Sequence, residues 1–225
     1  MSSSFAAGSA AAIGMELTSQ DGVVEEPFAL ASVTKPLVSL AILVAVEEGA
    51  LELDTPADEA LLPGATLRHL LAHASGLAPD RRERAYEPGT RRVYSNAGIE
   101  LAAELVADAV SMPFAQYFTE ALAPLTLRHT TLPGSPASGG CASVADLTAV
   151  LAELLAPSRL LHPDTLTELR AVQFPGLRGV LPGFGAQNPN DWGLGFEIRG
   201  HKYPHWTGAT NSPATYGHFG QSGTM

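Results

Sequence analysis

The segment from Ser32 to about Glu48 constrains the fold more than any other part of the sequence. It carries Pro36 in its first turn, where a missing N–H costs little, and Gly49 where a left-handed residue ends many helices. Apolar residues surround its whole circumference instead of forming one stripe: Leu37, Val38, Leu40, Ile42, Leu43, Val44 and Val46. A helix of this kind is buried on most sides, so we expect it to be the central element of the fold.

Helical and strand-like segments follow in separate blocks. Capping residues predict helices 67–73 after Thr66, 97–110 after Asn96 and 144–155 after Ser143, and two more helices are expected at 114–123 and 164–172. A short strand is expected to begin at Val23-Val24, and segments 192–198 and 216–221 have strand character. This order predicts an α+β fold, with an antiparallel sheet flanked by helices and a helical lobe inserted in it.

Length and composition suit one compact unit. The chain has 225 residues, of which 45% are hydrophobic, enough for a sizeable core. We expect residues 1–225 to form one unit, with an α/β lobe made of residues 1–52 and 175–225 and a helical lobe made of residues 53–174.

Charge and composition exclude several classes of protein. The formal net charge of -10 disfavours binding to nucleic acid. The longest apolar stretch, 37–46, is too short to span a membrane, and residues 1–12 lack the basic and apolar regions of a signal peptide. We therefore expect a cytoplasmic protein without a membrane span. The single cysteine, Cys141, excludes an internal disulfide and a cysteine-built zinc site.

Ser32-Val33-Thr34-Lys35 is the strongest candidate for chemistry. Residues three apart share a helix face, so the Lys35 amine is expected to reach the Ser32 hydroxyl. A serine needs an adjacent base to become a nucleophile, and a lysine serves as that base when burial keeps it neutral. The alternative is a serine that only caps the helix, beside a lysine placed there by chance. The motif alone is weak, but a buried lysine in an apolar helix costs stability unless it is used.

Two further segments carry polar groups suited to the same cleft. Tyr94 and Asn96 are two apart, so in an extended segment they face the same way; a phenol near a lysine ammonium is expected to have a lowered pKa. The alternative is a tyrosine packed in the core and an asparagine that caps a helix.

The glycine-flanked segment around His218 and Gly220 would let a substrate approach the backbone, and the Gln221 N–H would stabilise an oxyanion. The alternative is an ordinary edge strand.

Other patterns are weaker. His69 and His73 have the i, i+4 spacing of metal ligands but lack the usual glutamate, so we expect no metal and no cofactor. His201 and His205 are expected at the surface or the rim of a cleft. No serine is framed as Gly-x-Ser-x-Gly, which disfavours a nucleophile-elbow hydrolase. A cluster of arginines is expected to be a solvated loop: Arg81, Arg82, Arg84, Arg91 and Arg92.

Taken together, the three motifs resemble the serine β-lactamase and penicillin-binding-protein superfamily. Its pattern is Ser-x-x-Lys, then Tyr-x-Asn, then Lys/His-x-Gly, and the order here is the same. Connecting segments are similar to class C-type members, including 67–77, Glu87-Pro88-Gly89, Gly139-Gly140 and 192–195. The resemblance covers roughly residues 27–223. It implies that Ser32 is acylated, that Lys35 activates it and that Tyr94 shuttles protons. It further implies that Asn96, His218 and Gly220 bind substrate, and that the Ser32 and Gln221 N–H groups form the oxyanion hole.

Two departures from the family pattern shape the functional expectation. His218 stands where many members carry the lysine that holds a substrate carboxylate, which favours esterase-like activity on ester or amide substrates. The alternatives are a true β-lactamase or D,D-peptidase and, from another class, a non-catalytic binding module or an inactive truncated remnant. The chain ends five residues after Gly220, so we expect an incomplete sheet whose exposed edge permits a homo-oligomer.

Overall fold

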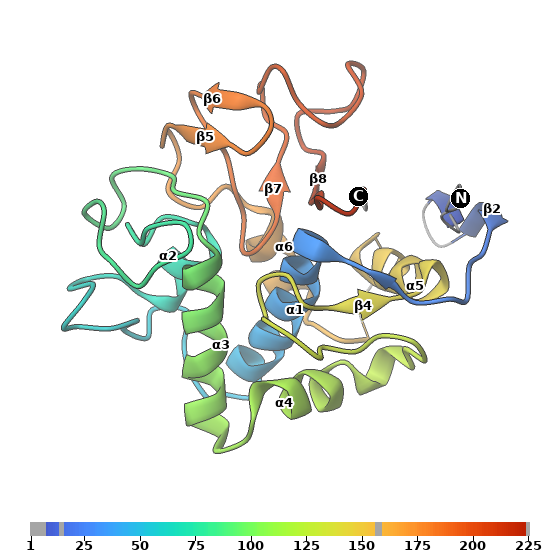
Figure 1. Cartoon of the computed structure of the whole chain (residues 1–225), viewed down its shortest axis with the longest axis horizontal. Coiled ribbons are helices and arrows are strands. Elements are labelled where there is room, and N and C mark those ends of the chain that lie inside the picture. Colours follow the sequence, from blue (N-terminus) through green and yellow to red (C-terminus); the bar gives the residue numbers. More distant parts are fainter. Residues whose placement is uncertain (1–7, 14–15, 156–158, 224–225) are drawn as a thin grey trace, which may run out of the picture.

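The computed structural model describes residues 8–13, 16–155 and 159–223. Its strands form four two-stranded antiparallel pairs: β1 (Gly8–Ile13) with β2 (Glu16–Gly22), β3 (Phe28–Ala29) with β4 (Cys141–Ala142), β5 (Gly179–Leu181) with β6 (Gly185–Gln187), and β7 (Glu197–Ile198) with β8 (Tyr216–Gly217). The α-helices are α1 (Thr34–Glu47), α2 (Leu67–Leu71), α3 (Asn96–Val110), α4 (Phe114–Ala121), α5 (Val144–Leu155) and α6 (Pro163–Arg170). Short antiparallel strands combined with helices confirm the expected α+β class (Figure 1).

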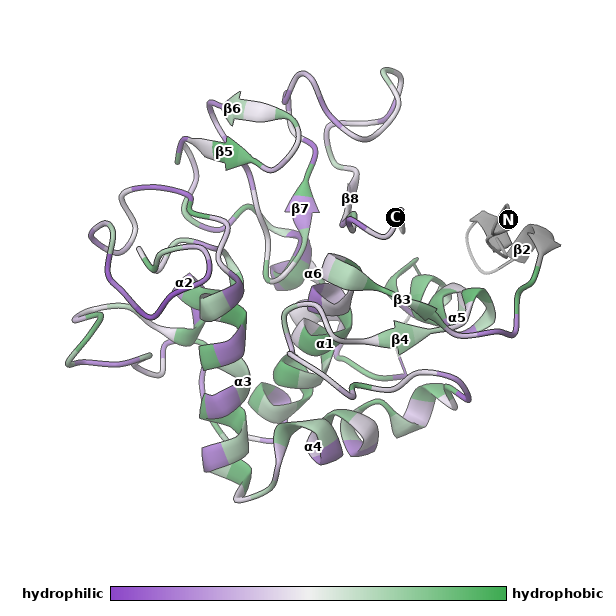
Figure 2. Ribbon diagram, in the orientation of Figure 1, coloured by the Kyte–Doolittle hydropathy of each residue, from purple (hydrophilic) through white to green (hydrophobic). Residues whose placement is uncertain are grey.

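The helix α1 lies at the centre of the molecule, as the sequence predicts (Figure 1). Every residue from Thr34 to Leu43 is buried, and α3 and α4 pack against it. Figure 2 colours much of its ribbon as hydrophobic. The α-helix begins at Thr34 and not at Ser32, because Ala31–Val33 form a separate 3-10 turn. Gly49 ends the segment with a φ of 74°, the left-handed conformation expected of it.

The structure confirms two of the predicted caps and corrects the third. Thr66 and His69 form a reciprocal capping box at α2, and the Ser143 hydroxyl accepts from the Asp146 N–H at 3.1 Å. At α3, Ser95 is the cap, because its hydroxyl accepts from the Gly98 N–H at 3.0 Å. The expectation that Asn96 caps this helix was wrong: Asn96 is the first helical residue, which leaves its carboxamide available for other contacts.

The strands are shorter than predicted. Of segment 192–198 only Glu197–Ile198 is a strand, and of segment 216–221 only Tyr216–Gly217. Gly195 accounts for the first difference, because its φ of 78° interrupts the extended chain. At this point the chain packs against α1, and a Cβ on Gly195 would lie 1.8 Å from Ser39 Oγ. Val23-Val24 lies between strands, and the hairpin β5–β6 was not predicted.

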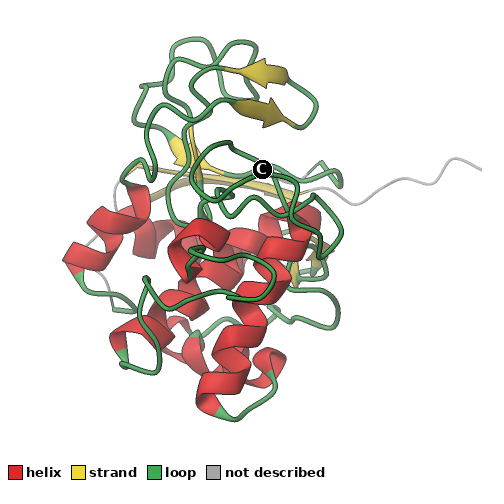
Figure 3. Ribbon diagram, turned by 90° about the vertical axis from the view of Figure 1, so that its left-hand side faces the viewer, coloured by secondary structure: helices red, strands yellow, loops and turns green. Residues whose placement is uncertain are grey.

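The helices and strands separate in space. Figure 3 shows most helices gathered at one end of the molecule and the short strands toward the other. Pairing of β4 with β3 joins the middle of the chain to its N-terminal part. The proposed division into two lobes stays a prediction. Within the described ranges, none of the helices combines the length and the apolar character that crossing a membrane requires.

Candidate active site

Ser32 lies in the 3-10 turn that leads into α1. The residue before it, Ala31, has a φ of 46°, a left-handed conformation that is strained for a residue with a side chain. Neighbouring segments hold this turn in place, since the Leu30 N–H donates to Gly140 O at 2.9 Å and the Gly140 N–H donates to Thr34 Oγ1 at 2.9 Å. A Cβ on Gly140 would lie 2.8 Å from Thr34 Oγ1, so this close approach requires glycine. The strained turn is therefore tied to the rest of the fold on both sides of Ser32.

Lys35 is fully buried and its amine meets the Ser32 hydroxyl. Lys35 Nζ lies 3.1 Å from Ser32 Oγ and donates to Ala137 O at 2.9 Å. Burial lowers the pKa of Lys35 to about 7, although the charges of Asp80 and Glu100 act to raise it. A large share of the amine is therefore neutral near pH 7 and able to take a proton.

Tyr94 lies next to Lys35, with its ring centroid 4.6 Å from Lys35 Nζ. Burial raises the pKa of Tyr94 to about 12, and a side-chain hydrogen bond with Ser32 only partly opposes this. The expectation that the phenol pKa would be lowered was wrong, because loss of solvation raises it and the charges of Asp80 and Glu197 act in the same direction. Tyr94 is thus a neutral phenol at ordinary pH, able to donate a proton to a departing group.

Asn96 begins α3, two residues beyond Tyr94. Its Nδ2 donates to Asp80 Oδ1 at 2.6 Å, and its backbone N–H donates to Pro79 O at 2.7 Å. Its Oδ1 is buried and meets no hydrogen-bond partner among the described residues. An unpaired buried acceptor is uncommon in folded proteins and calls for an explanation.

His218 follows β8 and is buried, 5% exposed. Its ring centroid lies 5.9 Å from that of Tyr94 and 5.6 Å from that of Trp192. Burial lowers the pKa of His218 to about 3, and the charge of Lys35 acts in the same direction. Burial therefore keeps the imidazole neutral well below pH 6.

The turn after His218 brings the chain back to the nucleophile. A Cβ on Gly220 would lie 2.6 Å from Leu30 O and 3.4 Å from the Ser32 nitrogen, so only glycine fits here. Gln221 lies in the turn that the Gly223 N–H closes on Gly220 O at 3.1 Å, and not in a strand as predicted. Its side chain is exposed. The backbone of this turn therefore lies beside that of Ser32.

Sequence reasoning missed two aromatic residues that enclose Tyr94. The His73 ring lies 4.7 Å from the Tyr94 ring and 4.6 Å from the Trp192 ring, centroid to centroid. The Ser95 N–H donates to His73 Nδ1 at 3.2 Å, so the proton of the neutral ring is on Nε2. Burial, with the charges of Lys35, His218 and Arg92, lowers the pKa of His73 well below its usual range. Both residues fall in segments quoted above for the family resemblance, but nothing in the sequence places them on Tyr94.

Arg92 corrects the expectation of a solvated arginine cluster. It is 1% exposed and donates to four backbone carbonyls, those of Ala72, Gln173, Phe174 and Asn190. Burial lowers its pKa to about 10, so it keeps its charge at neutral pH. Arg92 thereby ties together the loops that bear His73 and Trp192.

A buried ion pair organises the loop between β7 and β8. Lys202 Nζ and Glu197 Oε1 are 2.9 Å apart, and both side chains are fully buried. His205 Nε2 lies 2.9 Å from the same oxygen, and Trp206 Nε1 donates to Glu197 Oε2. The side chain of His205 is therefore turned inward, 3% exposed, and is not at the rim as expected. Trp206 in turn packs on Phe219, with ring centroids 5.9 Å apart, so this network supports the segment that carries His218.

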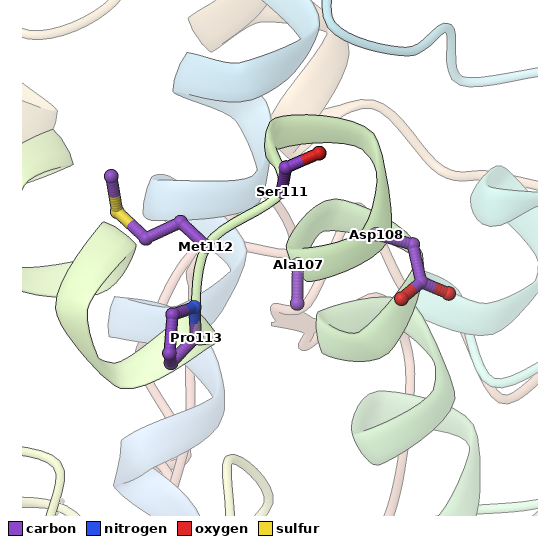
Figure 4. Close-up of a pocket in the computed structure, with 5 residues that line it drawn as sticks. All are labelled: Ala107, Asp108, Ser111, Met112 and Pro113. Atoms are coloured by element: carbon purple, nitrogen blue, oxygen red, sulfur yellow. The ribbon is translucent and has the colours of Figure 1, made fainter.

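The hollow drawn in Figure 4 is separate from these groups. It is lined by Ala107, Asp108, Ser111, Met112 and Pro113, at the end of α3 opposite to Asn96. These lining residues include one carboxylate, Asp108, and one hydroxyl, Ser111, but neither a lysine nor a histidine. Across residues 8–13, 16–155 and 159–223, we also find no group of three or more His, Cys, Asp or Glu side chains arranged to hold a metal ion.

Solved structures of known proteins share this fold. A β-lactamase from Mycobacterium bovis matches with a TM-score of 0.91 and 51% identity, over 96% of this chain and 79% of that one. The octameric penicillin-binding protein homologue from Pyrococcus abyssi shares the fold, with a TM-score of 0.68 and 18% identity over 82% of this chain and 58% of that one.

The D-alanyl-D-alanine-carboxypeptidase/endopeptidase AmpH of Escherichia coli K12 is 27% identical over 142 residues, or 48% of this chain. The match spans only 37% of the length of that relative. The sequence profile of the Beta-lactamase family matches residues 19–225, which is most of the chain. The chain therefore belongs to the Beta-lactamase family, and its fold is that of β-lactamases and transpeptidases.

Proposed function

We propose that this protein is a serine hydrolase that forms an acyl-enzyme on Ser32. The observation that carries the proposal is the 3.1 Å contact between Ser32 Oγ and the buried amine of Lys35, whose pKa burial lowers to about 7. A neutral amine at hydrogen-bond distance is the general base that a serine hydroxyl needs. Membership of a family of serine hydrolases supports the same conclusion.

The proposed acylation step moves one proton and one acyl group. Ser32 Oγ attacks the substrate carbonyl carbon while its proton passes to Lys35 Nζ. The oxyanion that results is stabilised by the backbone N–H groups of Ser32 and Gln221, since the Gly220 turn lies against the Ser32 nitrogen. The bond to the leaving alcohol or amine then breaks, and that group takes a proton from Tyr94. Lys35 returns its proton to the Tyr94 oxygen, so both residues end as they began.

Deacylation repeats the sequence with water. A water molecule loses a proton to neutral Lys35 and adds to the ester carbonyl, and Ser32 Oγ leaves with that proton as the free hydroxyl. The neutral phenol of Tyr94, with a pKa of about 12, suits the role of donor better than that of base.

Ester or amide substrates without a carboxylate are the preferred class. His218 offers no positive charge at neutral pH, since burial holds its pKa at about 3. A carboxylate of a β-lactam or of a peptide C-terminus would therefore lack a cation at this position. The similarity to the D-alanyl-D-alanine-carboxypeptidase/endopeptidase of Escherichia coli makes a D-alanyl-D-alanine peptidase the second candidate. Self-association through a sheet edge stays a prediction.

Intact-mass spectrometry with a fluorophosphonate or a p-nitrophenyl ester tests the proposal. We expect one adduct per chain on the parent protein and none on Ser32→Ala. Ser39→Ala is the matched control, because Ser39 is also buried and lies one turn beyond Lys35 on the same helix. Its variant should label like the parent. A folded parent protein that takes up no adduct, or an adduct that survives in Ser32→Ala, would refute the proposal in favour of a non-catalytic module.

A further inference from the structure

We propose that Glu100 is a positioning residue that orients the base Lys35 through the loop 131–141. A side-chain contact with Ser135 fixes this loop, and the loop in turn presents the Ala137 carbonyl to the amine. The inference rests on the proposed acyl-enzyme function and deepens it, because it names a residue that acts on the base from outside the reacting groups.

Three hydrogen bonds link the Glu100 carboxylate with the Lys35 amine. The Ser135 hydroxyl donates to Glu100 Oε1 at 2.5 Å and accepts from the Ala137 N–H at 3.0 Å. The Ala137 carbonyl accepts from Lys35 Nζ at 2.9 Å. Ala137 and Lys35 are both fully buried. The two polar groups of the Ala137 backbone are therefore used in opposite directions, one toward Glu100 and the other toward the base.

The loop 131–141 contains little regular secondary structure, so side-chain contacts matter for its position. Its ends are joined by the backbones of Thr131 and Cys141, which exchange two hydrogen bonds of 2.9 Å. These bonds close the loop on itself. The contact of Ser135 with Glu100 adds a tie to α3, which fixes the loop relative to the helices of the site.

The same loop also supports the turn of the nucleophile. Three residues beyond Ala137, Gly140 bonds Leu30 on one side of Ser32 and Thr34 on the other. The loop thus contacts the base through one carbonyl and the turn of Ser32 through the segment that follows. Its placement therefore bears on the distance between the nucleophile and the base.

Orientation of the amine decides whether it takes the serine proton. A neutral amine has one lone pair, which must point at the Ser32 hydroxyl for proton transfer. One N–H of Lys35 is committed to the Ala137 carbonyl, which restricts rotation of the amine beside Ser32 Oγ, 3.1 Å away. A misplacement of about 1 Å in such a site can cost about 10²-fold in rate. The anchoring of the Ala137 carbonyl is therefore part of the catalytic geometry.

The charge of Glu100 has a second effect that can be separated from the geometry. It acts to raise the pKa of Lys35, as does the charge of Asp80, while burial lowers that pKa to about 7. His73 and His218 also lie near the amine, but burial lowers the pKa of each, so both rings are neutral near pH 7. Among these groups, Lys35 is the one that titrates in this range.

Substitutions of Ser135 test the geometry while the Glu100 charge stays in place. Ser135→Ala should lower the saturating acylation rate with p-nitrophenyl butyrate about tenfold, the effect of one hydrogen bond, with KM little changed. Ser135→Thr restores a hydroxyl and should recover the parent rate. Ser138→Ala is the matched control, because Ser138 is an exposed serine of the same loop, and it should keep the parent rate.

Glu100→Gln tests the charge while keeping the geometry, because a carboxamide oxygen still accepts from the Ser135 hydroxyl. Loss of a nearby negative charge lowers the pKa of an amine, so the acid limb of the acylation rate should move to lower pH. Glu104→Gln makes the same change one turn further along α3, at an exposed glutamate, and should leave the limb in place.

Direct titration of the amine gives a readout without turnover. The chain has two lysines, Lys35 and Lys202, so protein labelled with 13C at lysine Cε gives two signals, and Lys35→Met assigns them. The Lys35 signal should titrate at lower pH in Glu100→Gln than in the parent, and at the parent pH in Glu104→Gln. Because Glu100→Gln keeps the hydrogen bond to the loop, this titration decides the inference even where Ser135→Ala does not fold.

The outcomes separate this inference from the proposed function. If the parent forms an adduct on Ser32 and Ser135→Ala forms it at the same rate, the inference is overturned and the acyl-enzyme stands. A Ser135→Thr variant as slow as Ser135→Ala, or a Lys35 signal unmoved in Glu100→Gln, would likewise overturn the inference. If the folded parent takes up no adduct, the proposed function is overturned, and the titration of Lys35 decides whether Glu100 acts on the amine.

Discussion

Burial pushes two nitrogen bases of the site toward their neutral forms, with opposite consequences. The pKa of Lys35 falls to about 7, which turns a permanent cation into a usable base. The pKa of His218 falls to about 3, which removes its charge over the whole physiological range. The site therefore combines an available base with a neutral residue at the position where many relatives of the superfamily place a cation.

Substitution of His218 tests its part in substrate selection. His218→Lys should raise kcat/KM for nitrocefin, which bears a carboxylate, by about one to two decades, the effect of a charge-assisted contact. It should change little for p-nitrophenyl butyrate, which has no charge. In the parent, the preference between the two substrates should stay the same between about pH 6 and pH 7.5, because His218 does not titrate there.

Parallel changes for both substrates would show instead that His218 serves the chemistry or the fold. A parent preference that shifts toward nitrocefin as the pH falls to about 6 would contradict the neutral state of His218.

Sequence spacing predicted the contact of Lys35 with Ser32, because the 3-10 turn of Ser32 leads directly into α1 and residues three apart still share a face. It did not predict the phenol pKa of Tyr94, since burial by His73 and Trp192 comes from segments far apart in the chain. Nor did it predict the partner of Asn96, because the contact with Asp80 depends on a loop that only the fold brings to α3.

At the level of elements, the turn after β8 is the one on which the proposed oxyanion hole depends. Gly220 packs on Leu30 O, so an added methyl group would push the turn away from Ser32. Gly220→Ala should therefore lower kcat by roughly 10²-fold, as the loss of one oxyanion donor does, with little change in KM.

Gly208→Ala is the control for this substitution. Gly208 lies in the exposed loop between β7 and β8, and a Cβ there would meet only the end of the Asn211 side chain. This variant should keep the parent kcat. A Gly220→Ala protein with the parent kcat would argue against an oxyanion donor in this turn.

The sequence predicts the helices better than the strands. The helix α1 was predicted because its apolar residues, Pro36 and Gly49 are all local signals. The strands were overestimated because Gly193 and Gly195 fit against other segments, the first so tightly that a Cβ would lie 2.0 Å from Leu169 O. The sequence does not predict such contacts, because they join segments that come together only when the chain folds.

At the scale of the whole molecule, the two lysines of the chain are both buried but differ in their partners. Lys202 is paired with Glu197, so Lys202→Met would leave a buried carboxylate and should cost about 3–5 kcal/mol of stability. Lys35 has no carboxylate within ion-pair distance among the described residues, and its positive form is disfavoured by burial.

The stability of the parent should therefore depend on pH through Lys35. Its folded pKa, about 7, lies below the unfolded value of 10.5, so the unfolded chain binds more protons between these values and stability rises with pH across that window. The contribution should be about 1.4 kcal/mol per pH unit and absent from Lys35→Met. Urea unfolding of both proteins at several pH values measures it, and equal slopes would contradict a neutral Lys35 in the folded state.

The pH dependence of acylation is the sharpest test of whether neutral Lys35 activates Ser32. Stopped-flow release of p-nitrophenol from p-nitrophenyl butyrate, followed by intact-mass analysis, gives the acylation rate and the adduct together. We expect one acyl group on Ser32, formed at a rate that rises with pH through a midpoint near the Lys35 pKa of about 7 and is lost in Lys35→Ala. Acylation at another residue, or a Ser32 acylation rate that does not change with pH through this range, would contradict this expectation.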